Sequence, residues 1–280
     1  MLLLLFASQV HPLSACSGQA GGNNTKAAAC AFEGRIESQS VDAFIARASD
    51  AGCKKITLTS LGGEAIDAIR LVDFLNANAI TVVLHDHCHS ACAQVIAVLA
   101  DDVIVEPDTL FFTHGISASA VAWLDAHPNA KGYDRVLIKA LSEDLLSRIS
   151  ARGGDPLMVY EPALRNEPIC VISRPSPRGE LIVSSKVTGW MPTREWMELA
   201  RGSPIGGEWI DTNDHFRRAL KANTSGHLDP KAIYGYGGPL IGRDLVIENY
   251  DPIAMTARIP LCSAEYEAQF WAAQSRRSPR

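Results

Sequence analysis

The sequence predicts an α/β fold in which helices join parallel strands. Between residues 54 and 114, the patterns follow the order strand, helix, strand, helix, strand, strand. Such alternation favours parallel pairing, because each helix carries the chain back to the start of the next strand. The chain has 280 residues, 47% of them hydrophobic, which is enough for one full core and a modest appendage.

Short runs of apolar and β-branched residues mark the expected strands. Residues 54–61 alternate apolar and polar side chains, and residues 80–86 are rich in β-branched ones. A weaker pattern at residues 179–185 is also typical of a strand. The strands expected before residue 165 span 31–36, 54–61, 80–86, 102–107 and 109–115.

Helical periodicity separates these strands. Residues 64–79 place apolar side chains at helical spacing, and Glu64 and Asp67 stand in the first turn, where the helix dipole stabilises acids. We expect Ser38 or Ser40 to cap the first helix. The expected helices span 40–52, 64–79, 90–100, 134–151 and 192–200. Residues 201–280 are glycine-rich and irregular, and we expect them to extend an α/β domain at residues 30–200.

The charge of the chain argues against a nucleic-acid partner. The formal net charge is −5 and the isoelectric point is about 5.9. The sequence contains no basic cluster that would neutralise phosphates. We therefore expect a protein that does not bind nucleic acid.

The stretch "LHDHCHSACAQ", residues 84–94, permits a metal site or a nucleophile. His85, His87 and His89 would share one face of a strand. Alternate residues of a straight strand lie about 6.5–7 Å apart, so three such imidazoles do not converge on one ion. No HExxH helix or paired CxxC motif supports a metal centre elsewhere in the sequence. We expect no metal.

The nucleophile interpretation centres on Ser90. This serine lies where an expected strand gives way to an expected helix, and small alanines follow it. The free N–H groups of a helix start can stabilise an oxyanion. The simpler alternative is that Ser90 only caps the helix, because serine is a preferred cap. Gly62-Gly63, which has the same strand-to-helix position, and His114, which ends a strand, shift the balance towards catalysis.

Three motifs together resemble the Clp-protease and crotonase superfamily, and most of all the exported Clp-protease-like proteins of bacteria. "SLGG" at residues 60–63 precedes a helix, and "HSAC" at residues 89–92 carries a serine. "TH" at residues 113–114 follows a strand pair that contains "ADDVIVEP". The resemblance covers residues 30–165, and "WMPTREWMELARG" at residues 190–202 is similar to a late segment of the family. It implies a superhelix of ββα units.

The resemblance also implies a catalytic role for each matched position. Ser90 would be the nucleophile and His114 the general base, as in other serine hydrolases. Gly62 or Gly63, together with Ala91, would supply the N–H groups of the oxyanion hole. The acid is expected at Glu167, with Glu161 and Asp155 as alternatives. The implied activity is ATP-independent hydrolysis of a peptide or protein without a cofactor, and homo-oligomers are common among such proteins.

The first residues are similar to the signal segment of a bacterial lipoprotein. The apolar run from Leu2 to Ala7 is too short to span a bilayer but fits a signal core. "LSAC" at residues 13–16 resembles a lipobox, which implies a signal peptide at residues 1–15, acylation of Cys16 and a tether at residues 16–29. An ordinary cleaved signal and a cytosolic protein remain alternatives. The lipoprotein interpretation implies a periplasmic protein held at a membrane by a lipid anchor.

Six cysteines remain when Cys16 is set aside, and the sequence does not select their pairing. Disulfides are plausible if the protein is exported, because the periplasm is oxidising. The alternative for Cys53, Cys88 and Cys92 is that they are small buried residues. The six are Cys30, Cys53, Cys88, Cys92, Cys170 and Cys262.

Two other functions remain open beside the hydrolase. A fold does not fix a function, so a binding or scaffold lipoprotein without catalytic activity could use the same framework. An enzyme of the crotonase type, acting on an acyl thioester, is the third alternative. The distance between the side chains of Ser90 and His114 distinguishes a hydrolase from a binding protein.

Overall fold

The computed structural model describes residues 27–115, 117–175, 181–223, 233–237 and 251–277. The expected signal peptide at residues 1–15, the lipidation site Cys16 and most of the tether therefore lie outside the described residues. None of the described helices is both long and apolar enough to span a membrane.

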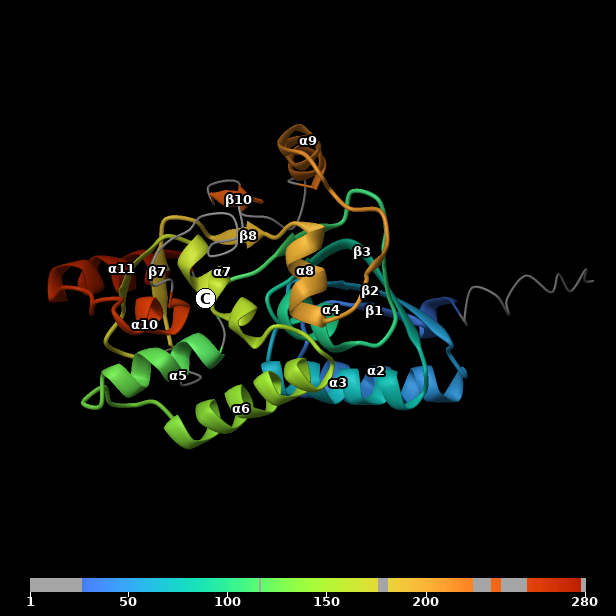
Figure 1. The fold of residues 1–280 in the computed structure, drawn as a ribbon, viewed down its shortest axis with the longest axis horizontal. Coiled ribbons are helices and arrows are strands. Elements are labelled where there is room, and N and C mark those ends of the chain that lie inside the picture. The colour runs from blue at the N-terminus through green and yellow to red at the C-terminus, as the bar shows by residue number, and fades with distance from the viewer. Residues whose placement is uncertain (1–26, 116, 176–180, 224–232, 238–250, 278–280) are drawn as a thin grey trace, which may run out of the picture.

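A mostly parallel sheet lies at the centre of the molecule (Figure 1). In the described part of the chain it has six strands, in the order β1, β2, β3, β4 and β9, with β5 also paired to β3. The strands are β1 (Ala31–Glu33), β2 (Lys55–Ser60), β3 (Thr81–His89), β4 (Val103–Val105), β5 (Leu110–Phe112) and β9 (Gly206–Gly207). The prediction of an α/β fold with parallel pairing is confirmed, whereas the superhelical arrangement of ββα units stays a prediction.

Strand β3 is longer than the sequence pattern predicts. The pattern ends at residue 86, but the strand continues to His89. Asp86 adopts a positive φ of 58°, and the register with β2 shifts near this point. The first part of β3 pairs with β4 and the part from His87 to His89 pairs with β5. Because of this irregularity the strand continues beyond its β-branched run, and Ser90 follows it beside the end of β5.

The main helices form where helical spacing predicts them. Glu37, rather than either serine, is the N-cap of α2, and Ser40 Oγ accepts a hydrogen bond from the N–H of Glu37 at 3.1 Å. Thr193 caps α8 by accepting a bond from the N–H of Trp196 at 3.2 Å. The predicted helices are α2 (Ser38–Asp50), α3 (Ala65–Ala77), α6 (Arg135–Ala151) and α8 (Arg194–Arg201). Helices α2 and α3 pack side by side below the sheet (Figure 1).

The segment after Ser90 differs from the single α-helix that the sequence predicts. It forms a π-helix, η1 (Cys92–Ile96), which runs into the short helix α4 (Ala97–Leu99). Irregular helical turns of this kind are frequent at functional sites. The sequence did not indicate helices α5 (Ser117–Ala126), α7 (Glu161–Arg165), α9 (Asn213–Asn223), α10 (Pro252–Ala257) and α11 (Ala264–Arg277), nor the 3₁₀-helix η2 (Pro156–Val159).

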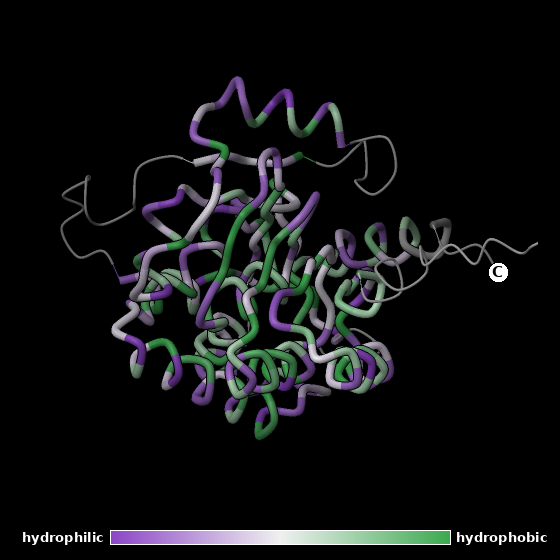
Figure 2. The backbone as a smooth tube through the Cα atoms, turned by 90° about the vertical axis from the view of Figure 1, so that its right-hand side faces the viewer, coloured by the Kyte–Doolittle hydropathy of each residue, from purple (hydrophilic) through white to green (hydrophobic). Residues whose placement is uncertain are grey.

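The main core lies between the sheet and its helices. The sheet strands are largely hydrophobic, whereas α9, at the top of the view, is mostly hydrophilic (Figure 2). Burial of these apolar side chains is the dominant stabilising contribution. The largest side chains with less than 2% exposure in this core include Phe44, Leu58, Leu84, Ile96 and Phe111.

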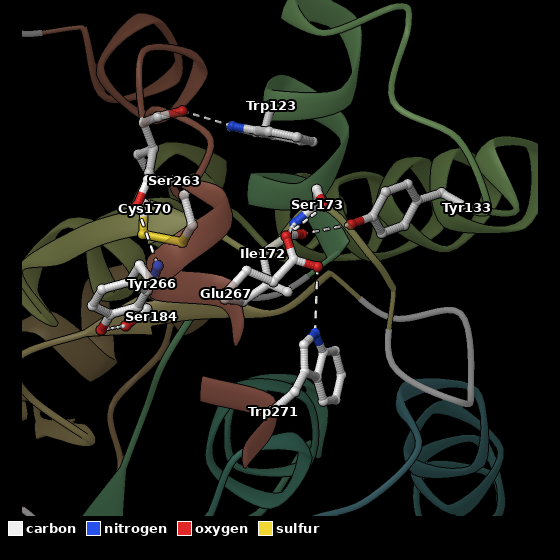
Figure 3. The surroundings of a disulfide bond; sticks show 12 residues. Trp123, Tyr133, Cys170, Ile172, Ser173, Ser184, Ser263, Tyr266, Glu267 and Trp271 are labelled. Atoms are coloured by element: carbon white, nitrogen blue, oxygen red, sulfur yellow. Dashed lines mark hydrogen bonds between the residues drawn. A yellow bond between two sulfur atoms is a disulfide. The ribbon is translucent and has the colours of Figure 1, made fainter. Parts of the chain in front are cut away.

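A smaller core supports a second part of the molecule, which we call the C-terminal lobe. The lobe consists of β6 (Pro168–Val171), β7 (Val183–Ser185), α10 and α11, with β6 and β7 antiparallel. Trp123 reaches it from α5 and donates a hydrogen bond to the carbonyl of Ile259 at 2.7 Å. Glu267 of α11 accepts hydrogen bonds from Ser173 and Trp271 (Figure 3).

Parts of residues 201–280 are joined to the elements before them. Strand β9 pairs with β4 in the main sheet, and helix α9 contacts β5. Strand β10 (Tyr234–Tyr236) pairs with β8 (Gly189–Met191). Elements β9, α9 and β10 therefore pack against β4, β5 and β8, respectively.

All six remaining cysteines are paired. Cys53, Cys88 and Cys92 are buried, as the sequence suggested, and each is also part of a disulfide. Their three bonds differ in sequence separation, which decides how much chain each one closes. The pairs are Cys30–Cys53, Cys88–Cys92 and Cys170–Cys262, with separations of 23, 4 and 92 residues.

Candidate active site

Ser90 occupies a strained turn between β3 and η1. Its φ of 53° lies in the left-handed region, which is uncommon for residues other than glycine. Such a conformation costs on the order of 1–3 kcal/mol and persists only when its surroundings impose it. Here the N–H of Ser90 donates to the carbonyl of Phe112 at 2.8 Å, so β5 holds the turn in place.

Two further features constrain this turn. A Cβ atom on Gly62 would lie 2.5 Å from Ser90 Cβ and 2.6 Å from the carbonyl oxygen of His89. Only glycine therefore allows the β2–α3 loop to approach Ser90 so closely. The Cys88–Cys92 disulfide joins the end of β3 to the start of η1 and so spans Ser90. The turn is fixed by backbone packing on one side and by a covalent bond across it.

His114 lies beside Ser90 because β5 runs parallel to the last residues of β3. Its Nε2 atom is 2.6 Å from Ser90 Oγ, and its Nδ1 atom is 2.7 Å from the carbonyl oxygen of Gly115. A carbonyl can only accept, so Nδ1 carries the proton that it donates. In the neutral ring Nε2 is then the acceptor for the Ser90 hydroxyl. This is the tautomer that a general base requires.

The side chains of Ser90 and His114 are accessible to a substrate. His114 is exposed and Ser90 is half-buried, so a substrate can reach both. The preceding residue, Thr113, exchanges backbone hydrogen bonds with Trp190 at 2.8 and 3.0 Å. The backbone that carries the base is therefore anchored while the imidazole stays accessible.

The two glycines of the expected oxyanion hole differ in what their N–H groups do. The N–H of Gly62 donates to Ser60 Oγ at 3.0 Å and is therefore already engaged. Within the described part of the chain, the N–H of Gly63 has no hydrogen-bond acceptor. Gly63 must be a glycine, because a Cβ atom there would lie 2.1 Å from the carbonyl oxygen of Ile36. Ala91 stands in the first helical turn, where no earlier intrahelical carbonyl is available.

The three carboxylates considered as the acid are engaged elsewhere. Glu167 pairs with Lys186 at 3.1 Å, and its side chain is 58% exposed. Asp155 caps η2 by accepting a bond from the N–H of Leu157 at 2.9 Å. Glu161 is buried and accepts bonds from Trp196 Nε1 at 2.7 Å and from Arg165 at 2.9 Å. The identity of the acid stays a prediction.

The three histidines before Ser90 have separate surroundings. Nδ1 of His85 contacts Glu106 at 2.7 Å and Nδ1 of His87 contacts Asp86 at 2.9 Å. His89 is buried, with its ring 4.7 Å from that of Phe112. Burial, with a smaller effect of His87, lowers the pKa of His89 to about 3, so this ring stays neutral. Among the described residues, no three His, Cys, Asp or Glu side chains group as metal ligands would.

Sequence reasoning missed two buried carboxamides near His114. Asn166 Nδ2 lies 3.4 Å from the carbonyl oxygen of Thr113. Gln94 contacts the backbone of His114 itself. For Gln94 a signal exists, because it is the one amide side chain in the apolar run of residues 91–100. A lone polar residue in such a run has to find a partner when it is buried.

Comparisons with known proteins do not identify a family for this chain. No family model and no curated protein matches the chain. Among solved structures, the chain is similar to the ClpP protease catalytic domain from Plasmodium falciparum, at 14% identity and a TM-score of 0.36. The match covers 48% of this chain and 72% of that chain. A TM-score of this size does not establish residue roles, which therefore depend on the geometry of the chain itself.

Proposed function

We propose that this protein is a serine hydrolase of the peptidase type, with Ser90 as nucleophile and His114 as general base. One observation carries the proposal. The hydroxyl of a serine held in a strained, left-handed turn lies 2.6 Å from an imidazole nitrogen whose tautomer makes it an acceptor. An ordinary helix cap needs neither the strain nor the imidazole.

The reaction follows from these positions. His114 Nε2 takes the hydroxyl proton while Ser90 Oγ attacks the substrate carbonyl carbon. The tetrahedral intermediate then collapses: the bond between the carbonyl carbon and the leaving group breaks, the imidazolium gives its proton to that leaving group, and the acyl group remains bound to Ser90 Oγ. Water attacks this acyl group with the same base, which releases the acid product and restores Ser90. The Gly115 carbonyl, 2.7 Å from Nδ1, stabilises the imidazolium between these steps.

The oxyanion of the tetrahedral intermediate needs donors on the side opposite His114. We assign this role to the N–H groups of Gly63 and Ala91. The close approach of Gly62 to Ser90 and Ala91 brings the two loops together, since a Gly62 Cβ atom would lie 3.0 Å from the nitrogen of Ala91. Loss of one such donor typically lowers kcat about 10²- to 10³-fold.

Substrate class and location belong to the same proposal. The resemblance of residues 60–63, 89–92 and 113–114 to Clp-protease motifs favours a peptide or protein substrate cleaved without ATP. Three disulfides are consistent with an oxidising compartment. These disulfides support our proposal that the protein lies outside the cytosol; we also propose that acylated Cys16 holds it at a bacterial membrane and that it forms homo-oligomers.

Hydrolysis of activated esters and fluorogenic peptides tests the proposal. We expect Ser90→Ala and His114→Ala each to lower kcat/KM at least about 10³-fold with an unchanged fold. Ser184→Ala is a matched control, because Ser184 is a buried serine of the C-terminal lobe that contacts Tyr266. Wild-type activity in Ser90→Ala would refute the assignment.

A binding or scaffold protein on the same fold is the second candidate. It is favoured by one feature, which is that the expected acid, Glu167, is solvent-exposed and paired with Lys186. For this candidate, peptides would be bound without turnover, and Ser90→Ala would leave their Kd unchanged. Calorimetry on peptides that are recovered intact distinguishes the two functions.

A further inference from the structure

Gln94 connects the nucleophile turn to the base. It lies within η1, four residues beyond Ser90, and only 3% of its surface is exposed. Its backbone N–H donates to the carbonyl of Ser90 at 2.8 Å. Its side chain extends to the end of β5, where His114 begins the next loop.

The carboxamide of Gln94 binds both polar backbone groups of His114. Gln94 Oε1 accepts from the N–H of His114 at 3.3 Å, and Gln94 Nε2 donates to the His114 carbonyl. With the bond to Ser90, three hydrogen bonds from one residue link the two members of the candidate pair. A displacement of the Ser90 turn relative to His114 would break at least one of these three hydrogen bonds.

We propose that Gln94 is a positioning residue that sets the separation of Ser90 Oγ and His114 Nε2. The inference rests on the proposed function, because this separation matters for proton transfer. The 2.6 Å contact leaves little tolerance, and a displacement of about 1 Å can cost on the order of 10²-fold in rate. Gln94 lies within the π-helical turn, and from there its carboxamide reaches the backbone of His114, which follows β5.

Asn76 provides a matched control for a purely structural carboxamide. Asn76 Nδ2 donates to the carbonyl of Leu99 at 3.0 Å, and Asn76 Oδ1 accepts from the N–H of Asp101 at 2.9 Å. Asn76 thus binds the backbone with both ends of its amide, as Gln94 does. The backbone that it binds lies at the end of α4, the helix into which η1 runs. Loss of either amide leaves backbone groups without partners, but only Gln94 contacts the pair.

The test compares Gln94→Met with Asn76→Leu, using hydrolysis of the best ester and the rate of inactivation by a fluorophosphonate. We expect a comparable fall in Tm, on the order of 5 °C, in both variants. In Gln94→Met we expect kcat and the inactivation rate to fall about 10- to 100-fold, with KM within about 3-fold. In Asn76→Leu all three should stay within about 3-fold. Equal rates for Gln94→Met and the wild type, or an equal loss in Asn76→Leu, would overturn the inference.

A second measurement does not depend on activity. Nitrogen NMR of the His114 imidazole reports its tautomer and its hydrogen bond at Nε2. We expect Gln94→Met to change these signals and Asn76→Leu to leave them as in the wild type. If the wild type hydrolyses nothing and never reacts with the probe, the proposed function fails, whereas unchanged His114 signals in Gln94→Met refute the role of Gln94 itself.

Discussion

The end of β3 around Ser90 and the C-terminal lobe each contain a disulfide, but the two bonds serve different purposes. Cys88–Cys92 joins residues only 4 apart, inside the main core, across a strained turn. Cys170–Cys262 joins residues 92 apart and connects β6 to the segment before α11. A short loop constrains the unfolded chain little, so the first bond mainly fixes local geometry and the second mainly supports the fold.

Packing shows the same contrast. The Ser90 turn is held by close backbone contacts with Gly62 and by the hydrogen bond to Phe112. Among the described residues, the small core between the lobe and α5 has four buried side chains, and hydrogen bonds such as that of Trp123 to Ile259 join its elements. These four are Trp123, Leu124, Val171 and Ile259. Changes at the turn should therefore affect activity more than stability, and changes in the lobe should do the reverse.

Apart from substitutions of Ser90 and His114 themselves, the largest effect on activity is expected from Gly62→Ala. The added methyl would meet Ser90 Cβ at 2.5 Å and displace the turn, so we expect activity to fall at least about 100-fold. Gly34→Ala is the control, because Gly34 also has a positive φ, of 117°, but has no atom within 4 Å of its added Cβ. Both variants bear backbone strain of about 1–2 kcal/mol. Ester hydrolysis and urea unfolding separate strain from displacement, and equal activity in the two variants would contradict the account.

Removal of the Cys88–Cys92 disulfide and removal of the Cys170–Cys262 disulfide should have different effects on activity and stability. Loop-closure entropy assigns about 4.5 kcal/mol to Cys170–Cys262 and about 2 kcal/mol to Cys88–Cys92. We expect Cys88→Ala/Cys92→Ala to lower kcat about 10- to 100-fold because the Ser90 turn loses its covalent constraint. For Cys170→Ala/Cys262→Ala we expect the larger loss of unfolding free energy and a kcat within about 3-fold of the wild type.

Chemical denaturation and assays on the folded fraction measure both quantities. The contrast fails if the two double variants lose activity in proportion to stability. It also fails if loss of Cys88–Cys92 leaves kcat unchanged, since the turn would then be held by its backbone contacts alone.

A smaller effect concerns pH. Burial lowers the pKa of His89 from 6.5 to about 3, so between these values the unfolded chain binds a proton that the folded protein does not. Stability should therefore fall as pH falls through this window, by at most about 1.4 kcal/mol per pH unit from this group. Urea unfolding between pH 4 and 6 should show a flatter dependence for His89→Leu.

The smallest effect is expected from Glu167→Gln. Its carboxylate is exposed and paired with Lys186, and such surface pairs contribute about 0–1 kcal/mol. We expect kcat/KM to stay within about 3-fold and the acid limb of its pH profile to stay in place. A loss of about 10²-fold or more would show that Glu167 orients His114 after all.

The strands and helices around the site could be predicted because their patterns are local. The alternation in residues 54–61 and the β-branched run at 80–86 result from burial on a sheet. Helix α5 was missed because its sequence, "SASAVAWLDA", has small and apolar residues on all sides and hence no polar face. Its position depends on α6 and α10, which no local pattern reveals.

Some features of the candidate site could be predicted from the sequence and others could not. Ser90, His114 and the glycine pair could be named because motifs are contiguous in sequence. The Gly62 hydrogen bond to Ser60 and the acceptor at Gly115 depend on local backbone conformations that no residue pattern reveals, and the disulfide pairing depends on which cysteines the fold brings together. The length of β3 was underestimated because the positive φ of Asp86 interrupts the pattern without ending the strand.

The central claim is that His114 activates Ser90, and covalent labelling tests it most directly. The intact protein is treated with a fluorophosphonate, and the modified peptide is identified by mass spectrometry. We expect the adduct on Ser90 alone, with a rate that falls at least about 10²-fold in His114→Ala. Absence of the adduct from Ser90 in the folded wild type, or an equal rate in His114→Ala, would contradict the claim.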